Sequence, residues 1–162
     1  MARVLWVLAV FSACASTSFR EGTVRKPQVR YSVGQVSAAW TLVRVSETDL
    51  AYLAKSSSHS LAVNATCEGH DDPPLEALTQ HLLIGFTDRE LVAEEKMTID
   101  GRAGHRSHYK ATLDGVPVEL AFVVAKKDGC VYDFTYLAPV GRFAEHLQDF
   151  EALWQAFHAE ER

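Results

Sequence analysis

A regular spacing of Asp-Gly pairs in the second half of the chain limits the fold more than any other feature. The pairs stand fourteen residues apart, at 100–101, 114–115 and 128–129. Asp-Gly favours a two-residue type I′ turn, because both central residues of that turn need a positive φ, which aspartate and glycine tolerate. β-prone residues flank each pair, which predicts four strands joined into an antiparallel meander. These strands cover residues 92–99, 103–113, 116–125 and 130–137.

Apolar residues at helical spacing predict two helices. The first follows Pro73-Pro74, and Asp71 and Asp72 stand where an N-cap and the helix dipole favour acidic groups. Its apolar stripe consists of Leu75, Leu78, Leu82, Leu83 and Phe86. The second helix lies near the C-terminus, and its stripe consists of Phe143, Leu147, Phe150, Trp154 and Phe157. Burying each of these side chains is worth about 1.5–3 kcal/mol, so this stripe must lie on the sheet.

Two shorter strands, over 52–54 and 60–66, precede the first helix. The element order predicts an α+β fold in which an antiparallel meander sheet carries two packed helices. A chain of 162 residues with 48% apolar residues has enough material for one ordinary domain.

The first residues are typical of an export signal. Arg3 is followed by eight apolar residues, Val4 to Phe11, then by two small residues and Cys14. Such a run is too short to span a membrane as a helix. The segment 10–14 resembles the lipobox of bacterial lipoproteins, although Phe11 stands where that family usually has leucine. Ala13-Cys14-Ala15 also fits the cleavage pattern of ordinary secreted proteins, so a secreted soluble form is the alternative.

The lipobox resemblance implies that residues 1–13 are removed and that Cys14 is joined to lipid. Two or three acyl chains then hold the protein to a membrane, at about 0.8 kcal/mol for each buried CH₂ group. Ala15 and Ser16 after the cysteine imply the outer membrane, facing the periplasm. We predict a flexible tether over 14–35, with a short strand at 29–33, and a single α+β domain over 36–162.

The two remaining cysteines, Cys67 and Cys130, are candidates for a disulfide. An even pair in an oxidising compartment favours a bond, and both lie at predicted strand ends. The alternative is two buried free thiols.

Residues 36–160 have a recognisable layout: Trp40 before short strands, a helix preceded by proline, the meander, the strand motif Tyr132-x-Phe134-x-Tyr136 and a closing helix rich in phenylalanine. This layout resembles the PsbP-like fold, which includes the extrinsic protein of the oxygen-evolving complex and bacterial lipoproteins of the DcrB type. It implies a small binding or assembly module, usually without catalytic chemistry. Together with the lipid address, the layout predicts a cell-envelope lipoprotein that uses no cofactor and whose partner is another envelope protein.

Composition and motifs argue against several other functions. The net charge is −5 and no basic stripe exists, so we expect no nucleic-acid partner. No serine nucleophile motif or phosphate-binding loop is present. His105 and His108 are three apart on a predicted strand and therefore face opposite sides of the sheet, so we predict no metal site from them.

One polar surface remains as a candidate binding face. Arg102, Arg106, His108 and Lys110 share one face of the second meander strand. This face is either an ordinary solvated surface or a site for an anion or a partner protein. The alternative function is therefore a periplasmic carrier of a small ligand or a metal ion.

Overall fold

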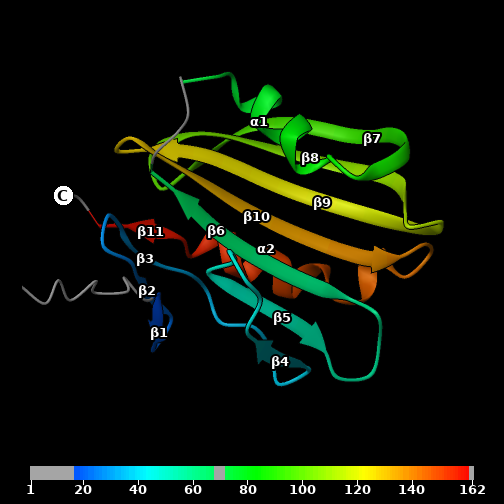
Figure 1. The fold of residues 1–162 in the computed structure, drawn as a ribbon, viewed down its shortest axis with the longest axis horizontal. Helices are drawn as coiled ribbons and strands as arrows, with labels where there is room; N and C mark the ends of the chain where they lie inside the picture. The colour runs from blue at the N-terminus through cyan, green and yellow to red at the C-terminus, as the bar shows by residue number, and fades with distance from the viewer. Residues whose placement is uncertain (1–16, 68–71, 161–162) are drawn as a thin grey trace, which may run out of the picture.

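The computed structural model describes residues 17–67 and 72–160, most of which form two antiparallel sheets (Figure 1). The long sheet has the strand order β4 (Trp40–Val43), β5 (Leu50–Ala54), β6 (Ser60–Thr66), β10 (Cys130–Pro139), β9 (Val116–Lys127), β8 (Arg102–Leu113) and β7 (Phe86–Ile99). The small sheet has the order β1 (Ser18–Arg20), β2 (Thr23–Arg25), β3 (Arg30–Ser32) and β11 (His158–Ala159). The helical elements are α1 (Leu75–Leu82), the 3₁₀ turn η1 (Phe143–Glu145) and α2 (Leu147–Gln155). None of the helices in these two ranges is long and apolar enough to cross a membrane.

The four meander strands form as the turn spacing predicts, and they extend beyond the predicted ends. Asp100, Asp114 and Asp128 have φ angles of 48°, 49° and 54°, and the glycine after each is also positive, at 74°, 81° and 75°. These angles suit type I′ turns, whose twist matches that of the flanking strands. Each turn therefore fixes the register of the strands that it joins.

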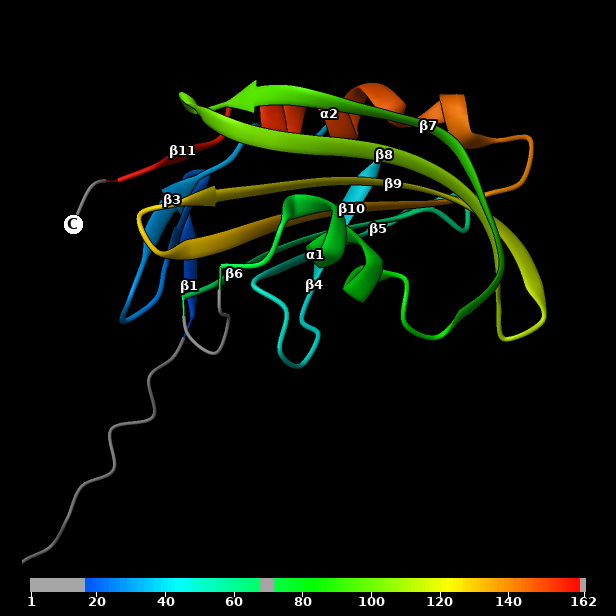
Figure 2. The same ribbon diagram turned by 90° about the horizontal axis from the view of Figure 1, so that it is seen from above.

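The long sheet is covered on both faces. Figure 2 shows α1 and α2 on opposite sides of it. On the α1 face, Leu120 and Phe122 pack with Leu83, while Ala121 and Val123 belong to the main core on the α2 face. The alternation predicted for β9 is confirmed, and so is the α+β class. Because β9 is buried on both faces, nearly all of its residues are apolar.

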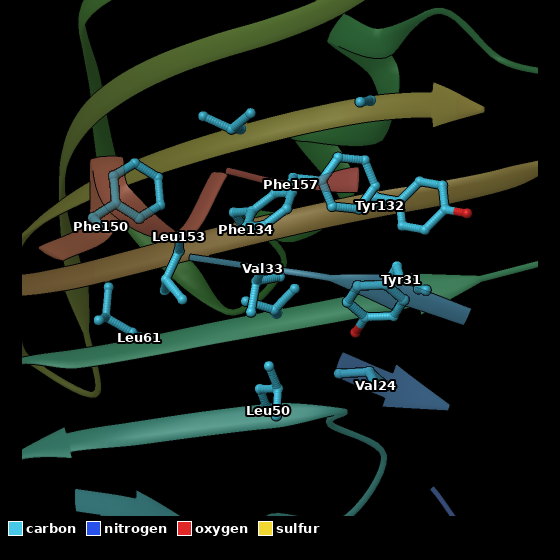
Figure 3. Packing of buried hydrophobic residues seen from close by; sticks show 14 of the residues in the cluster. Val24, Tyr31, Val33, Leu50, Leu61, Tyr132, Phe134, Phe150, Leu153 and Phe157 are labelled. Carbon is cyan, nitrogen blue, oxygen red and sulfur yellow. The ribbon is translucent and has the colours of Figure 1, made fainter. Parts of the chain in front are cut away.

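The main core lies between the long sheet, α2 and the small sheet (Figure 3). Tyr31 of β3 meets Tyr132 of β10 edge to face, with ring centroids 5.7 Å apart, and lies 6.0 Å from Phe157. Phe150 and Leu153 of α2 are fully buried in the same core. The predicted C-terminal stripe does lie on the sheet, although Phe143 falls in η1 and Phe157 lies just beyond α2.

The prediction of a flexible tether is wrong for residues 17–35, although the short strand predicted at 29–33 is present as β3. Three strands form in this segment, and Val24 and Tyr31 are completely buried. The turn at Glu21-Gly22 has φ values of 50° and 78°, the same pattern as the Asp-Gly turns. Gly34 then lies so close to α2 that a Cβ atom there would stand 1.9 Å from the carbonyl oxygen of Ala152. Strands β1 and β2 were not predicted because charged residues alternate with the few apolar residues of this segment, so the sequence shows no clear apolar pattern.

The first helix differs from its prediction at both ends. It ends at Leu82, and Gly85, with a φ of 94°, turns the chain so that Phe86 begins β7. Pro74 is the N-cap residue, and no side chain caps the helix. Asp72 instead pairs with Lys126 of β9, while Asp71 lies outside the described residues.

Cys67 and Cys130 form a disulfide, as the sequence predicts. Their Cα atoms are 4.0 Å apart, because β6 and β10 are paired neighbours in the long sheet. Cys14 lies outside the described residues.

Candidate functional site

A groove on the α2 side of the long sheet contains part of the predicted binding face. Strands β7 and β8 form one wall, and η1 and the start of α2 form the other. The groove has a volume of about 380 Å³. It is lined by Ala93, Glu94, Glu95, Arg106, Ser107, His108, Ala121, Phe143 and Leu147.

Arg106 is held between two carboxylates in this groove. One guanidinium nitrogen donates to Glu95 of β7 and another donates to Glu151 of α2, each at 3.0 Å. The side chain thus ties the sheet edge to the helix. Arg106 is poorly placed to bind an anion, because Glu95 and Glu151 already neutralise its charge. This arrangement argues against the anion site that was predicted for this face.

His108 is fixed by a carboxylate and by an aromatic ring. Its Nε2 lies 3.1 Å from Oε2 of Glu119, whose other oxygen accepts a hydrogen bond from the Gly141 backbone at 2.9 Å. The imidazole also stacks on Phe143, with ring centroids 4.0 Å apart. The ring is therefore oriented rigidly, with Glu119 as an almost buried base beneath it.

The other members of the predicted face do not reach the groove. Arg102 lies 3.8 Å from Asp128 at the turn between β9 and β10, and Lys110 is exposed beyond the groove. His105 lies on the opposite face, where it contacts Thr79 of α1 at 3.0 Å, so His105 and His108 are separated as strand alternation predicts.

The groove combines an apolar floor with a charged rim. Phe143, Leu147, Ala93 and Ala121 supply the floor, while Glu95, which is paired with Arg106, flanks it. The Glu94 carboxylate lies on the α1 face, 3.4 Å from Nε2 of His105. This chemistry suits an apolar side chain. The Ser107 Oγ is buried and makes no hydrogen bond among the described residues.

A second polar group lies on the other side of η1, where His59 meets Glu145 and His146. These side chains bring potential metal-ligand atoms within 4.8 Å of one another. His59 is 1% exposed and lies just before β6, far in sequence from the other two. Sequence reasoning missed this group, since neither a fixed spacing nor strand alternation relates position 59 to position 146.

A third feature is a pocket of about 600 Å³ between β1 and the β4–β5 connection. Arg20, Lys26 and Arg44 line it, together with the exposed apolar residues Leu42 and Val45. Lys26 pairs with Asp49 at 2.8 Å, whereas Arg20 and Arg44 take part in none of the ion pairs within the described ranges.

Polar residues next to this pocket join the two sheets. Asp49 accepts a hydrogen bond from the Tyr31 hydroxyl at 2.8 Å as well as pairing with Lys26. Burial and the Asp49 charge raise the pKa of Tyr31. Asp133 of β10 accepts from Asn64 at 3.4 Å, and burial, reinforced by the charge of Asp49, raises its pKa to about 6.

Comparison with known proteins identifies the fold. No protein-family model and no curated protein sequence matches the chain. Solved structures do match it. CyanoP, the cyanobacterial PsbP from Synechocystis sp. PCC 6803, has a TM-score of 0.55 at 13% identity over 96% of this chain and 99% of its own. LpqN, involved in cell envelope biogenesis of Mycobacterium tuberculosis, has a TM-score of 0.59 at 9% identity, over 93% and 88%.

A third match is PA94 from Pseudomonas aeruginosa, a protein of unknown function, with a TM-score of 0.60 at 10% identity over 91% of this chain and 99% of that one. Taken together, these similarities show that the chain has a PsbP-like fold. The resemblance predicted from the layout of residues 36–160 is confirmed at the level of the fold. Similarity at such low identity says nothing about shared function.

Proposed function

We propose that this protein is an exported, lipid-anchored module of the cell envelope that binds another envelope protein and catalyses no reaction. The Cys67–Cys130 disulfide carries the proposal, because structural disulfides persist in oxidising compartments outside the cytosol. The apolar run before Cys14 and the lipobox resemblance add an export route and an anchor. The fold of CyanoP and of the envelope-biogenesis protein LpqN is compatible with such a role.

Because residues 17–35 form strands and not a flexible tether, a lipid anchor at Cys14 would lie close to the folded domain. Three residue steps separate Cys14 from Thr17, the first described residue, and a fully extended chain covers about 11 Å in that number of steps. An anchor at Cys14 therefore holds the pocket beside β1 against the membrane. Arg20 and Arg44 then meet anionic headgroups, and Leu42 and Val45 meet the interface.

In this orientation the groove of Arg106 and His108 remains available to a partner protein. Its polar side chains already contact one another, so it offers shape and apolar contact, not reactive chemistry. A partner segment that presents an apolar residue matches the floor of the groove.

Mass spectrometry of the protein extracted from membranes tests the anchor and the compartment together. We expect a chain that begins at Cys14, carries acyl groups and lacks two hydrogens because Cys67 and Cys130 are bonded. A soluble intracellular form that begins at Met1 and has free thiols overturns the proposal.

Cross-linking in intact membranes tests the partner. A photo-reactive residue at position 95, in the groove, should yield a defined adduct with an envelope protein, while the same residue at the exposed position 116 should not. Equal labelling from both positions, or none at 95, contradicts a partner site in the groove.

The alternative is a carrier that holds a small ligand in this groove, which the apolar floor and volume favour. Native mass spectrometry of the purified protein distinguishes the two functions. A bound molecule of defined mass supports the carrier, and the bare chain mass supports the module.

A further inference from the structure

The group formed by His59, Glu145 and His146 has the composition of a site for a transition-metal ion. Two imidazoles and a carboxylate supply the nitrogen and oxygen donors that Zn²⁺ and its neighbours in the first transition series prefer. Their ligand atoms lie within 4.8 Å of one another, and the two imidazole rings meet edge to face with centroids 4.9 Å apart. Small side-chain rotations are enough to bring these donors around one ion.

Both histidines are oriented by oxygen atoms on their outer nitrogens. Nδ1 of His59 lies 2.7 Å from the Ser57 hydroxyl, and Nδ1 of His146 lies 3.6 Å from a carboxylate oxygen of Asp149. Asp149 is itself held by the Trp40 indole at 2.9 Å and by the Ser37 backbone at 2.7 Å. Histidines that bind metals are commonly held by an outer hydrogen bond that fixes the tautomer, as Ser57 can do for His59. The contact of His146 with Asp149 is longer than a hydrogen bond and places the carboxylate beside the ring.

The surroundings of His59 Nε2 also suit a cation. This nitrogen lies 3.1 Å from the Arg142 carbonyl oxygen. When Nδ1 carries the ring proton and donates it to Ser57, the lone pairs of Nε2 and of the Arg142 carbonyl oxygen face each other across 3.1 Å. A cation bound by both atoms removes this repulsion. In the other tautomer, Nε2–H donates a hydrogen bond to the carbonyl oxygen instead.

Arg142 pairs with the carboxylate of Glu145. Its guanidinium donates two hydrogen bonds to Glu145, each at 2.7 Å. The two side chains are 46% and 43% exposed, so the arginine can move into solvent and release the carboxylate. The exposed side of Glu145 also gives an ion a path to the buried His59.

We propose that His59, Glu145 and His146 form a binding site for one divalent transition-metal ion, of which Zn²⁺ is the representative, with the Arg142 carbonyl oxygen in the fourth position. The ion joins the start of β6 to η1 and α2, so binding strengthens the contact between the C-terminal helix and the long sheet. The site requires no lipid anchor and no envelope partner.

Titration with Co²⁺ and Zn²⁺ tests the site on the full chain. We expect one Co²⁺ per chain, visible absorption bands of four- or five-coordinate cobalt, displacement by Zn²⁺, and a higher Tm with the ion bound. Glu145→Gln and His146→Gln should each weaken binding at least about tenfold and remove the Tm increase, and Ser57→Ala should weaken it about tenfold through the outer contact.

His158→Gln is the matched control, because His158 is an exposed histidine paired with Asp100 and lies outside the group. It should bind Co²⁺ like the unmodified chain, and circular dichroism should show all four variants folded. Absence of stoichiometric binding at micromolar metal overturns the proposal. So does binding that survives both Glu145→Gln and His146→Gln, or that His158→Gln weakens equally.

Discussion

The meander and the small sheet are built from similar strands but are held together differently. Strands β7 to β10 pair with their neighbours in sequence through two-residue turns, so each pairing is local. The small sheet takes β11 from the far end of the chain and docks through a few contacts, among them Tyr31 on Asp49 and Gly34 on α2. Local pairing needs little loop closure, whereas the small sheet requires the rest of the fold to be present.

This comparison predicts that the small sheet opens before the meander. Its strands have two or three residues each, and its core contribution depends on Val24 and Tyr31. Amide hydrogen exchange should be fastest in β1 to β3 and slowest in β9 and β10.

The largest expected effect follows removal of the disulfide. Replacing Cys67 and Cys130 with serine frees a segment of 63 residues that contains α1 and three of the four meander strands. The unfolded chain gains entropy, so the free energy of unfolding should fall by about 4 kcal/mol in denaturant titrations. Reduction of the unmodified protein should give the same change. A loss below about 1 kcal/mol would mean that the local turns alone hold the meander in register.

The next effect concerns the docking of the small sheet. Gly34→Ala places a Cβ against the Ala152 carbonyl and should cost about 3 kcal/mol, because backbone on both sides must shift. Gly115→Ala is the control: its φ is 81° with nothing within 4 Å, so it should cost only about 1 kcal/mol. Equal losses would show that close approach of the small sheet to α2 does not matter.

A smaller effect, of opposite sign, is expected at Asp133. Its raised pKa of about 6 means that the folded protein holds this proton over the range from about pH 4 to pH 6, where the unfolded chain releases it. The free energy of unfolding therefore falls as pH rises through that range. Asp133→Asn should stabilise the protein by about 2 kcal/mol at pH 7 and leave it unchanged at pH 4. If the difference in stability between Asp133→Asn and the unmodified protein did not change with pH, ionisation of Asp133 would not be its cause.

The smallest effect is expected for Tyr31→Phe. This change removes one hydrogen bond to Asp49 while Lys26 and the Ala65 backbone still satisfy that carboxylate. The loss should be about 1.5 kcal/mol, and exchange in β1 to β3 should accelerate while that in β9 stays constant. Uniform acceleration throughout the chain would show that the two sheets unfold as one unit.

Sequence reasoning succeeded where a local signal was strong. The Asp-Gly pairs predicted the turns, and alternation predicted which residues of β9 and β10 share a face. It failed at Glu21-Gly22, although this turn has the same positive φ values, because its flanking strands contain few apolar residues. It also predicted the four-residue face on β8, of which only Arg106 and His108 reach the groove.

Within the described residues, the order of amino acids was enough to predict the meander, the α+β class and the two cysteines that bond. Backbone preference at aspartate and glycine, together with the alternation of side chains, acts over a few residues and can be recognised in the order of residues. Tertiary structure alone decided which charges neutralise Arg106 and that His59 meets His146. Such contacts join distant segments, and their positions follow from the packing of helices and sheets.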